Sequence, residues 1–137
     1  MILKAINSRL GCKFAPRTLI EGEAYDCVTF IASVYHEAGI IPEIPEFPDY
    51  RVYGKGNEMR DLTCQIIDDT DSFSVDEKKV AHGDLLVFSE AGRGHHVAIF
   101  LEGRLMAHCV HRRGVVIDTY APPISDSLYR IYRPKAL

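Results

Sequence analysis

One thiol and several imidazoles are the side chains in this sequence best suited to covalent chemistry. Cys27 directly follows Asp26 and opens the apolar stretch VTFIASVYHEA, so it lies where a helix can begin. A cysteine at a helix start can act as a nucleophile if a histidine lies close enough to accept its proton. Otherwise Cys27 is only a small buried residue. The positions of the histidines decide between these interpretations.

The segment 27–38 is predicted to be a helix. Asp26 is a typical N-cap, and Gly39 is a typical residue just beyond a C-cap. Apolar residues recur inside the segment at helical spacing and predict one buried stripe: Cys27, Ile31, Val34 and Ala38. A first helix is predicted to end at Gly11, and another to cover about 57–67.

The part of the chain after Gly83 has the pattern of β-strands. Five short segments rich in β-branched or aromatic residues are separated by tight turns: DLLVF, HVAIFL, RLMAHCV, GVVIDTY and LYRIYR. Short connections predict a mainly antiparallel sheet. The preceding stretches IIPEIPEFPDY and DDTDSFSVDEKK are predicted to be surface loops. The expected fold is α+β, with N-terminal helices packed on a sheet of about five strands in a single domain, 1–137.

Only some of the six histidines can serve Cys27. Three lie at the far end of its helix or in exposed turns: His36, His82 and His111. The others lie on two neighbouring predicted strands: His95, His96 and His108. A two-residue turn at 102–103 would set Val97 opposite His108 and place His96 diagonally near it; a longer turn or a bulge would align the two. These two imidazoles are the candidate base and its orienting partner, the alternative being hydrogen-bonded core histidines.

Strand alternation separates the two adjacent histidines. His96 shares a face with the small Ala98, whereas His95 shares the other face with Val97. A helix crossing close to the sheet would favour the face of Ala98. His96 is therefore the preferred base.

These residues resemble the NlpC family of papain-like cysteine peptidases, many of which cleave peptides of the bacterial cell wall. Asp26-Cys27 and Phe30 match the family's nucleophile motif, the strand 96–100 matches its His-Val-Gly-Ile-Tyr strand, and 107–109 matches the context of its third polar residue. The resemblance covers about residues 10–133. It implies a papain-like fold, a Cys27-His96-His108 site and a peptidoglycan peptide as substrate. The C-terminal third further resembles small members from phage tails or gene-transfer particles.

The sequence departs from the family pattern at three positions near the nucleophile. Val28-Thr29 replace the usual Ser-Gly, and Phe14 stands where the family commonly has a tyrosine. Tyr25 is a candidate to replace that hydroxyl. The candidate substrate- or oxyanion-binding residues are Tyr25, Asp26 and His95, together with the backbone N–H of Cys27.

The expected chemistry follows from this arrangement. The helix dipole and a protonated His96 would lower the pKa of Cys27, and His96 would later protonate the leaving amine. His108 would fix the tautomer of His96. Two alternatives stay open. One is acyl transfer or deamidation through the same thioester, and the other is a catalytically silent tail or binding module in which Cys27 is only packed.

Composition limits the other classes of function. The formal net charge of −3 and the scattered basic residues argue against nucleic acid as a partner. The four cysteines contain no C-x-x-C pair, so neither a disulfide framework nor a zinc site is predicted, and no cofactor is expected. The N-terminus is too short and polar for a signal peptide or membrane span. We therefore expect synthesis in the cytoplasm and delivery to the wall by a phage-like particle or other partner proteins.

Overall fold

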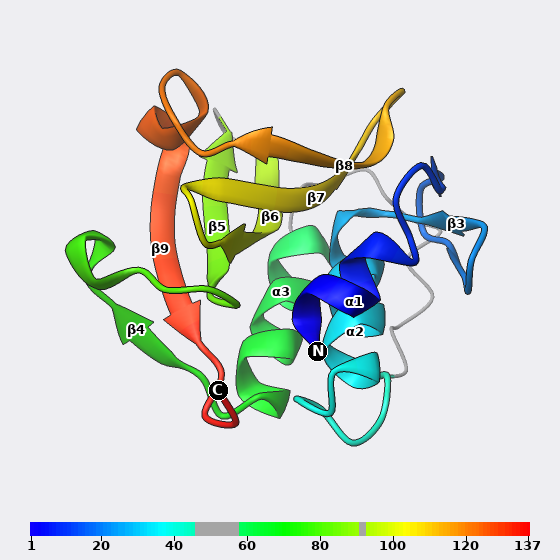
Figure 1. Cartoon of the computed structure of the whole chain (residues 1–137), viewed down its shortest axis with the longest axis horizontal. Helices are drawn as coiled ribbons and strands as arrows, with labels where there is room; N and C mark the ends of the chain where they lie inside the picture. Colours follow the sequence, from blue (N-terminus) through cyan, green and yellow to red (C-terminus); the bar gives the residue numbers. More distant parts are fainter. Residues whose placement is uncertain (46–57, 91–92) are drawn as a thin grey trace.

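The computed structural model describes residues 1–45, 58–90 and 93–137, without the side chains of 58–61, 90 and 93–95. Within these ranges the α-helices are α1 (Ile2–Asn7), α2 (Cys27–Glu37) and α3 (Glu58–Asp69). They lie together on one side of a large sheet (Figure 1). The first helix ends four residues earlier than predicted, because residues 8–11 form a turn. No helix in the described part of the chain is long and apolar enough to cross a bilayer.

The large sheet has six strands in the described ranges. They are β4 (Phe73–Val75), β5 (Leu85–Glu90), β6 (Arg93–Leu101), β7 (Leu105–Val110), β8 (Gly114–Thr119) and β9 (Leu128–Arg133). Their order is β4-β9-β5-β6-β7-β8, and every neighbouring pair is antiparallel. The expected α+β fold is confirmed. The prediction of a loop over 68–79 is wrong in part, because β4 pairs with β9 and the 3-10 helix η1 (Glu77–Lys79) follows it.

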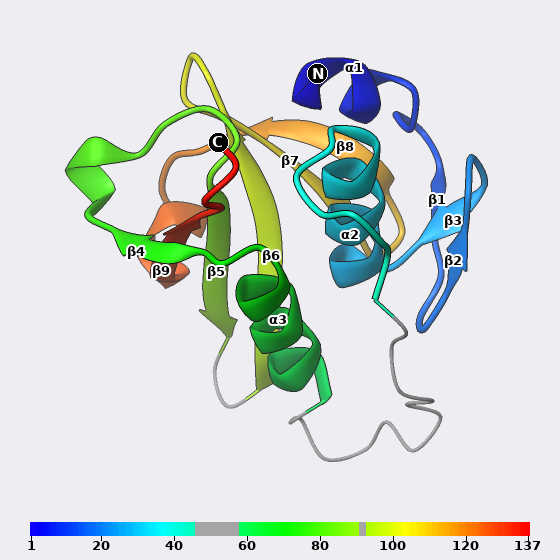
Figure 2. The same ribbon diagram turned by 90° about the horizontal axis from the view of Figure 1, so that it is seen from below.

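A second, smaller sheet leads into α2. It consists of β1 (Lys13–Phe14), β2 (Leu19–Ile20) and β3 (Ala24–Tyr25), in the order β1-β3-β2. β3 ends one residue before Asp26, so this sheet fixes the direction in which the chain enters the helix. Figure 2 shows α2 between the small sheet and the strands of the large one.

The helix α2 is buried over most of its length. All nine residues from Cys27 to Tyr35 are buried, rather than one stripe as predicted. Both predicted caps are present: the Asp26 side chain accepts hydrogen bonds at the N-terminus, and Gly39 adopts a positive φ of 74° after the C-cap. A helix enclosed on every side holds its first residue in a fixed position.

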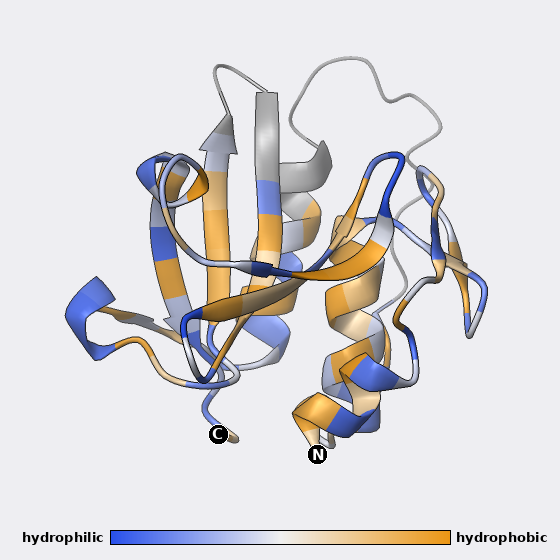
Figure 3. Ribbon diagram, turned by 45° about the horizontal axis from the view of Figure 1, so that its top comes forward, coloured by the Kyte–Doolittle hydropathy of each residue, from blue (hydrophilic) through white to orange (hydrophobic). Residues whose placement is uncertain are grey.

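The two faces of the large sheet belong to different apolar clusters. Val97 and Ile99 pack with the helices, whereas Ala98 and Phe100 pack on the opposite face with Phe88. A second short 3-10 helix, η2 (Ile124–Ser127), contributes to this smaller cluster. The prediction that the helices cross the face of Ala98 is therefore wrong. Figure 3 shows that α2 and the central strands of the large sheet are mostly apolar.

The register of β6 and β7 also differs from the predicted one. Leu101 pairs with Leu105, not with Arg104, because the turn contains three residues. Gly103 and Arg104 have positive φ values of 84° and 56°. These conformations allow a turn that is one residue longer than the predicted two-residue turn. In a two-residue turn His108 would face the same side as Val97; the additional residue brings it to the side of His96.

Candidate active site

Cys27 occupies the first position of α2 and is only 5% exposed. The Oδ1 atom of Asp26 accepts hydrogen bonds from the N–H groups of Val28 at 2.9 Å and Thr29 at 2.8 Å. The backbone N–H of Val97 lies close enough to the Cys27 sulfur to lower the pKa of the thiol. Because this N–H belongs to the peptide bond between His96 and Val97, the thiol lies against β6 at the predicted base.

The strands β6 and β7 separate beside Cys27. Their pairing ends at Ile99 and Ala107, although both strands continue beyond these residues. His96 and His108 lie in the separated part, and the Nε2 atom of His96 is 2.8 Å from the Nδ1 atom of His108. The Cys109 thiol on β7 donates to the carbonyl of Tyr25, at the end of β3. The start of α2 thus contacts both strands where they part.

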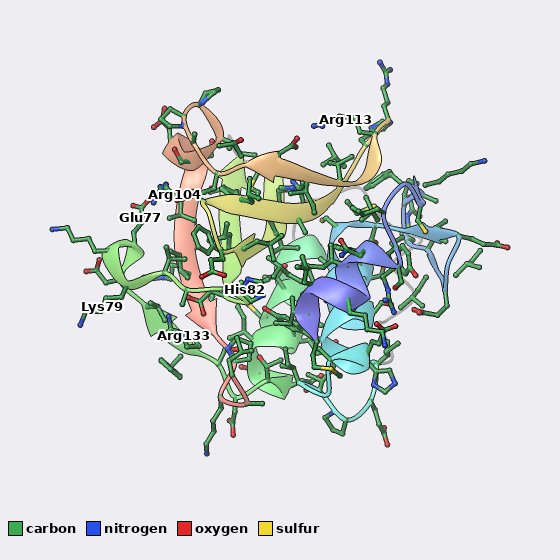
Figure 4. All side chains as sticks on the ribbon, viewed as in Figure 1. Glu77, Lys79, His82, Arg104, Arg113 and Arg133 are labelled. Carbon is green, nitrogen blue, oxygen red and sulfur yellow. The ribbon has the colours of Figure 1, made fainter. Side chains whose placement is uncertain are left out.

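The chain of side chains continues beyond His108 to two residues that the sequence argument did not select. The Nε2 atom of His108 is 2.7 Å from Oδ2 of Asp118 on β8. Arg113 donates two hydrogen bonds to the same carboxylate, at 2.8 and 2.9 Å. Figure 4 shows Arg113 at the β7–β8 hairpin, far from the labelled Glu77, Lys79 and Arg133. In the sequence, the only sign of this role is that Asp118 is an acidic residue in the mainly apolar strand GVVIDTY.

The electrostatic setting of the thiol differs from the predicted one. Burial raises the pKa of Cys27, and the neighbouring Asp26 charge raises it further, against a smaller lowering effect of the Val97 N–H. The N–H of Cys27 at the helix start lowers the pKa only slightly, and the Asp26 carboxylate occupies the N–H groups of Val28 and Thr29. The expectation of a lowered pKa is therefore wrong for this structure, and Cys27 is a neutral thiol.

The imidazoles are neutral for a related reason. Burial, followed by the neighbouring His108, lowers the pKa of His96 to about 4. Burial also lowers the pKa of His108, although Asp118 opposes this effect. The pKa of Asp118 is held at about 2, chiefly by its hydrogen bond with Arg113, so this carboxylate is ionised. At neutral pH the site contains a thiol, two neutral imidazoles and a carboxylate–guanidinium pair.

The other predicted site residues have different surroundings. Tyr25 is fully buried, and its hydroxyl accepts a hydrogen bond from the Gly22 N–H at 2.8 Å, so it is not presented to a substrate. Asp26 is occupied as the helix cap. The side chain of His95 lies outside the described residues. The N–H of Cys27 lies near its own sulfur and not at the Asp26 carboxylate, which accepts from Val28 and Thr29.

The two unusual residues after the nucleophile are both structural. The Thr29 hydroxyl accepts the Asp26 N–H at 2.9 Å and donates to the carbonyl of Thr18 at 2.7 Å, which completes a capping box. Val28 is buried against α3 and the sheet, beside Ile66 and Leu85. Thr29 therefore fixes the start of the helix through its side chain.

The remaining sulfur and imidazole groups lie apart from this arrangement. All four cysteines are free, and Cys64 is exposed on α3. His82 and His111 are exposed, as expected, and so is His36 at the far end of α2. His111 stacks on Phe14 with ring centres 5.5 Å apart. Over the ranges that the structure describes, no group of three or more His, Cys, Asp or Glu residues is arranged to hold a metal ion.

Comparison with known proteins identifies the family of the chain. A sequence model of the NlpC/P60 family matches residues 18–133, which include the thiol, both imidazoles and Asp118. The chain belongs to the NlpC/P60 family. No curated protein sequence matches it.

Solved structures of this family have the same fold. An NlpC/P60 family protein from Bacillus cereus ATCC 10987 is 23% identical, with a TM-score of 0.68 over 97% of this chain and 39% of that one. The NlpC/p60 domain of the peptidoglycan hydrolase SagA is 17% identical, with a TM-score of 0.61, 96% of this chain covered and 95% of that one. RipD from Mycobacterium tuberculosis, described as a non-catalytic, peptidoglycan-binding NlpC/p60 protein, is 15% identical, with a TM-score of 0.57 and coverages of 96% and 92%.

The lengths of these proteins differ. The chain spans 39–42% of the first three structures that it matches. The matched SagA domain and RipD chains are, by contrast, covered to 95% and 92%. At these identities the structures establish the fold alone, and the activity has to be argued from the site.

Proposed function

We propose that this NlpC/P60 domain is a cysteine peptidase that hydrolyses an amide bond in peptidoglycan peptides. One observation carries the proposal: the hydrogen bond between the two imidazoles lies where β6 contacts the thiol at the start of α2. Packing alone does not require a thiol one residue along β6 from a hydrogen-bonded pair of imidazoles. Cys27 is the proposed nucleophile, His96 the base and His108 its orienting partner.

The neutral state of the site favours proton transfer during attack rather than a preformed ion pair. His96 takes the proton of Cys27 as the sulfur forms a bond to the substrate carbonyl carbon. The electron pair of the carbonyl moves to its oxygen, and the N–H of Cys27 is available to donate to that oxyanion. His96 then gives the proton to the leaving nitrogen as the carbon–nitrogen bond breaks.

Hydrolysis of the resulting thioester uses the same residues. Water attacks the carbonyl carbon while His96 accepts its proton. The carbon–sulfur bond then breaks, and the proton returns to the sulfur. The products are a free amine, a carboxylic acid and the original thiol. No oxidant, reductant or metal enters the balance.

A digest of soluble peptidoglycan fragments tests this proposal. The wild-type chain is expected to release new amino termini, detected by mass spectrometry, and Cys27→Ala to release none. Cys64→Ala is the matched control, because Cys64 is an exposed thiol of the same chain, and it is expected to behave as wild type. Equal product from Cys27→Ala would sink the mechanism.

Three further measurements separate the two alternatives from hydrolysis. Acyl transfer or deamidation predicts that an added amine captures the thioester as a new amide, or that ammonia appears without a new amino terminus. A silent binding module predicts retention on insoluble peptidoglycan without any product. The capped and buried start of α2 favours hydrolysis or acyl transfer over the silent module, because it holds the thiol against β6 at Val97, next in sequence to the hydrogen-bonded His96. Delivery by a phage-tail or gene-transfer particle stays a prediction from sequence.

A further inference from the structure

We propose that Asp118, held by Arg113, is a positioning residue that selects the reactive tautomer of His96 through His108. This inference rests on the proposed role of His96 as base. Asp118 touches neither the thiol nor the proposed base directly. Its effect passes along two hydrogen bonds, from Asp118 to His108 at 2.7 Å and from His108 to His96 at 2.8 Å.

The protons can be assigned by counting donors and acceptors. An ionised carboxylate only accepts hydrogen bonds, so the Nε2 atom of His108 must carry its proton toward Asp118. A neutral His108 then has a lone pair on Nδ1, and the Nε2 atom of His96 must donate to it. The remaining nitrogen of His96, Nδ1, is left unprotonated. This is the form that can accept the proton of Cys27.

The opposite assignment would disable the site. If His108 carried its proton on Nδ1, His96 would have to accept it on Nε2 and would carry its own proton on Nδ1. The lone pair of His108 would also face the negative charge of Asp118, which is repulsive. Asp118 therefore favours one of two otherwise similar tautomer pairs.

Arg113 holds Asp118 in the orientation that this tautomer selection requires. Its two hydrogen bonds reach both oxygens of Asp118 and fix the plane of the carboxylate. The positive φ values of Arg112, 69°, and of Gly114, 75°, form the turn that directs Arg113 back along β8. Because the pair has no net charge, it adds little attraction for a protonated His96. Orientation, rather than charge, is the expected contribution.

The β7–β8 register places Asp118 for this task. His108 pairs with Val116, so Asp118 lies two residues further along β8 on the same face. Asp118 is 29% exposed and Arg113 is 54% exposed, which is typical of ion pairs with little effect on stability. A role limited to folding is therefore a poor account of a carboxylate that also contacts the buried His108.

The test combines side-chain nitrogen NMR with kinetics on Asp118→Asn. In the wild type, ring spectra are expected to show a protonated Nε2 and an unprotonated Nδ1 in both histidines. The amide of Asn can donate to His108 as well as accept from it, so the variant is expected to lose this single state. On peptidoglycan fragments, we expect kcat to fall about ten- to a hundredfold with KM nearly unchanged. Residues that orient a metal-binding histidine through a hydrogen bond have effects of this size.

Asp126→Asn is the matched control, because Asp126 is an exposed acid on the short helix η2. It is expected to keep the wild-type spectra and kcat. Unchanged tautomers in a folded Asp118→Asn, or changed tautomers with an unchanged kcat, would overturn the proposal. The spectra require no turnover, so a wild-type chain that fails to cleave peptidoglycan would refute the proposed function separately from this tautomer assignment.

Discussion

Two arginines of this protein hold carboxylates in networks that run in opposite directions. Arg9 is only 5% exposed, and its acidic partners Glu21 and Glu37 are half exposed, so the buried charge is satisfied from the surface. Arg113 is itself on the surface, and its network runs inward through Asp118 to His108, which is 3% exposed.

The inner ends of the two networks differ. Arg9 also donates to the Ser33 hydroxyl at 2.8 Å and to the Ala5 carbonyl at 2.7 Å, and Ser33 donates in turn to Glu21. This network closes on itself and ties α1 to α2. The Arg113 network ends at His96, whose Nδ1 atom makes no hydrogen bond among the described residues. A closed network fits a structural role, whereas an open one leaves a group available for chemistry.

Removal of the Arg9 side chain is expected to have the largest effect on stability. Arg9→Met should lower the free energy of unfolding by about 2–3 kcal/mol, because Ser33 and a backbone carbonyl lose their buried donor while the glutamates return to water. Urea denaturation measures this change. The kcat of the folded variant on peptidoglycan fragments is expected to stay at the wild-type value. A large loss of kcat without a shift of the urea midpoint would reverse the assignment of the two networks.

Removal of the Arg113 side chain is expected to change the pH dependence of activity instead. For the wild type, the acid limb of kcat/KM should lie near pH 4, where His96 takes up a proton. The Arg113 charge lowers the pKa of His108, whose ring also faces His96 and Asp118. In Arg113→Gln this pKa rises, so a proton enters the imidazole pair at a higher pH.

The acid limb of Arg113→Gln is therefore expected to move to higher pH. A pH–rate profile on the same peptidoglycan fragments measures the shift, and Arg112→Gln, on the same turn, is the matched control. An acid limb that stays in place, or moves to lower pH, would contradict the coupling. The urea midpoint of Arg113→Gln should be close to that of the wild type.

The smallest effect is expected at the outer end of the Arg9 network. Glu37→Gln removes one half-exposed partner at 3.1 Å, and Glu21 continues to satisfy Arg9. The free energy of unfolding should change by less than about 1 kcal/mol, with slightly greater loss at low salt. Urea denaturation at two salt concentrations provides the measurement. A loss as large as that of Arg9→Met would show that the network depends on each of its members.

Local patterns were sufficient to predict the elements that carry the thiol and the base. The cap at Asp26 and Gly39 after the helix define α2 from neighbouring residues alone, and the alternation around His96 defines β6. The pairing of β4 with β9 is not predictable in this way, because it joins residues from distant parts of the chain, such as Phe73 and Arg133. Distant partners leave no local signal.

The details of the site depended on geometry that sequence periodicity does not contain. One residue in a left-handed conformation at Arg104 changed the register that brings His108 to the side of His96. Which sheet face meets the helices is a property of the whole fold. The small size of Ala98 therefore did not predict that face, although the same reasoning led to His96 as the candidate base. Asp118 could be recognised only after the β7–β8 register was known. The pKa of Cys27 depended on burial and on the Asp26 cap together.

The central claim is that His96 activates Cys27 for amide hydrolysis, and a comparison of two histidine variants tests it most directly. The rate of release of new amino termini from peptidoglycan fragments is measured for wild type, His96→Ala and His82→Ala, an exposed histidine of the same chain. The account predicts a loss of about a thousandfold for His96→Ala and a near wild-type rate for His82→Ala. A folded His96→Ala that releases product at the wild-type rate would contradict it.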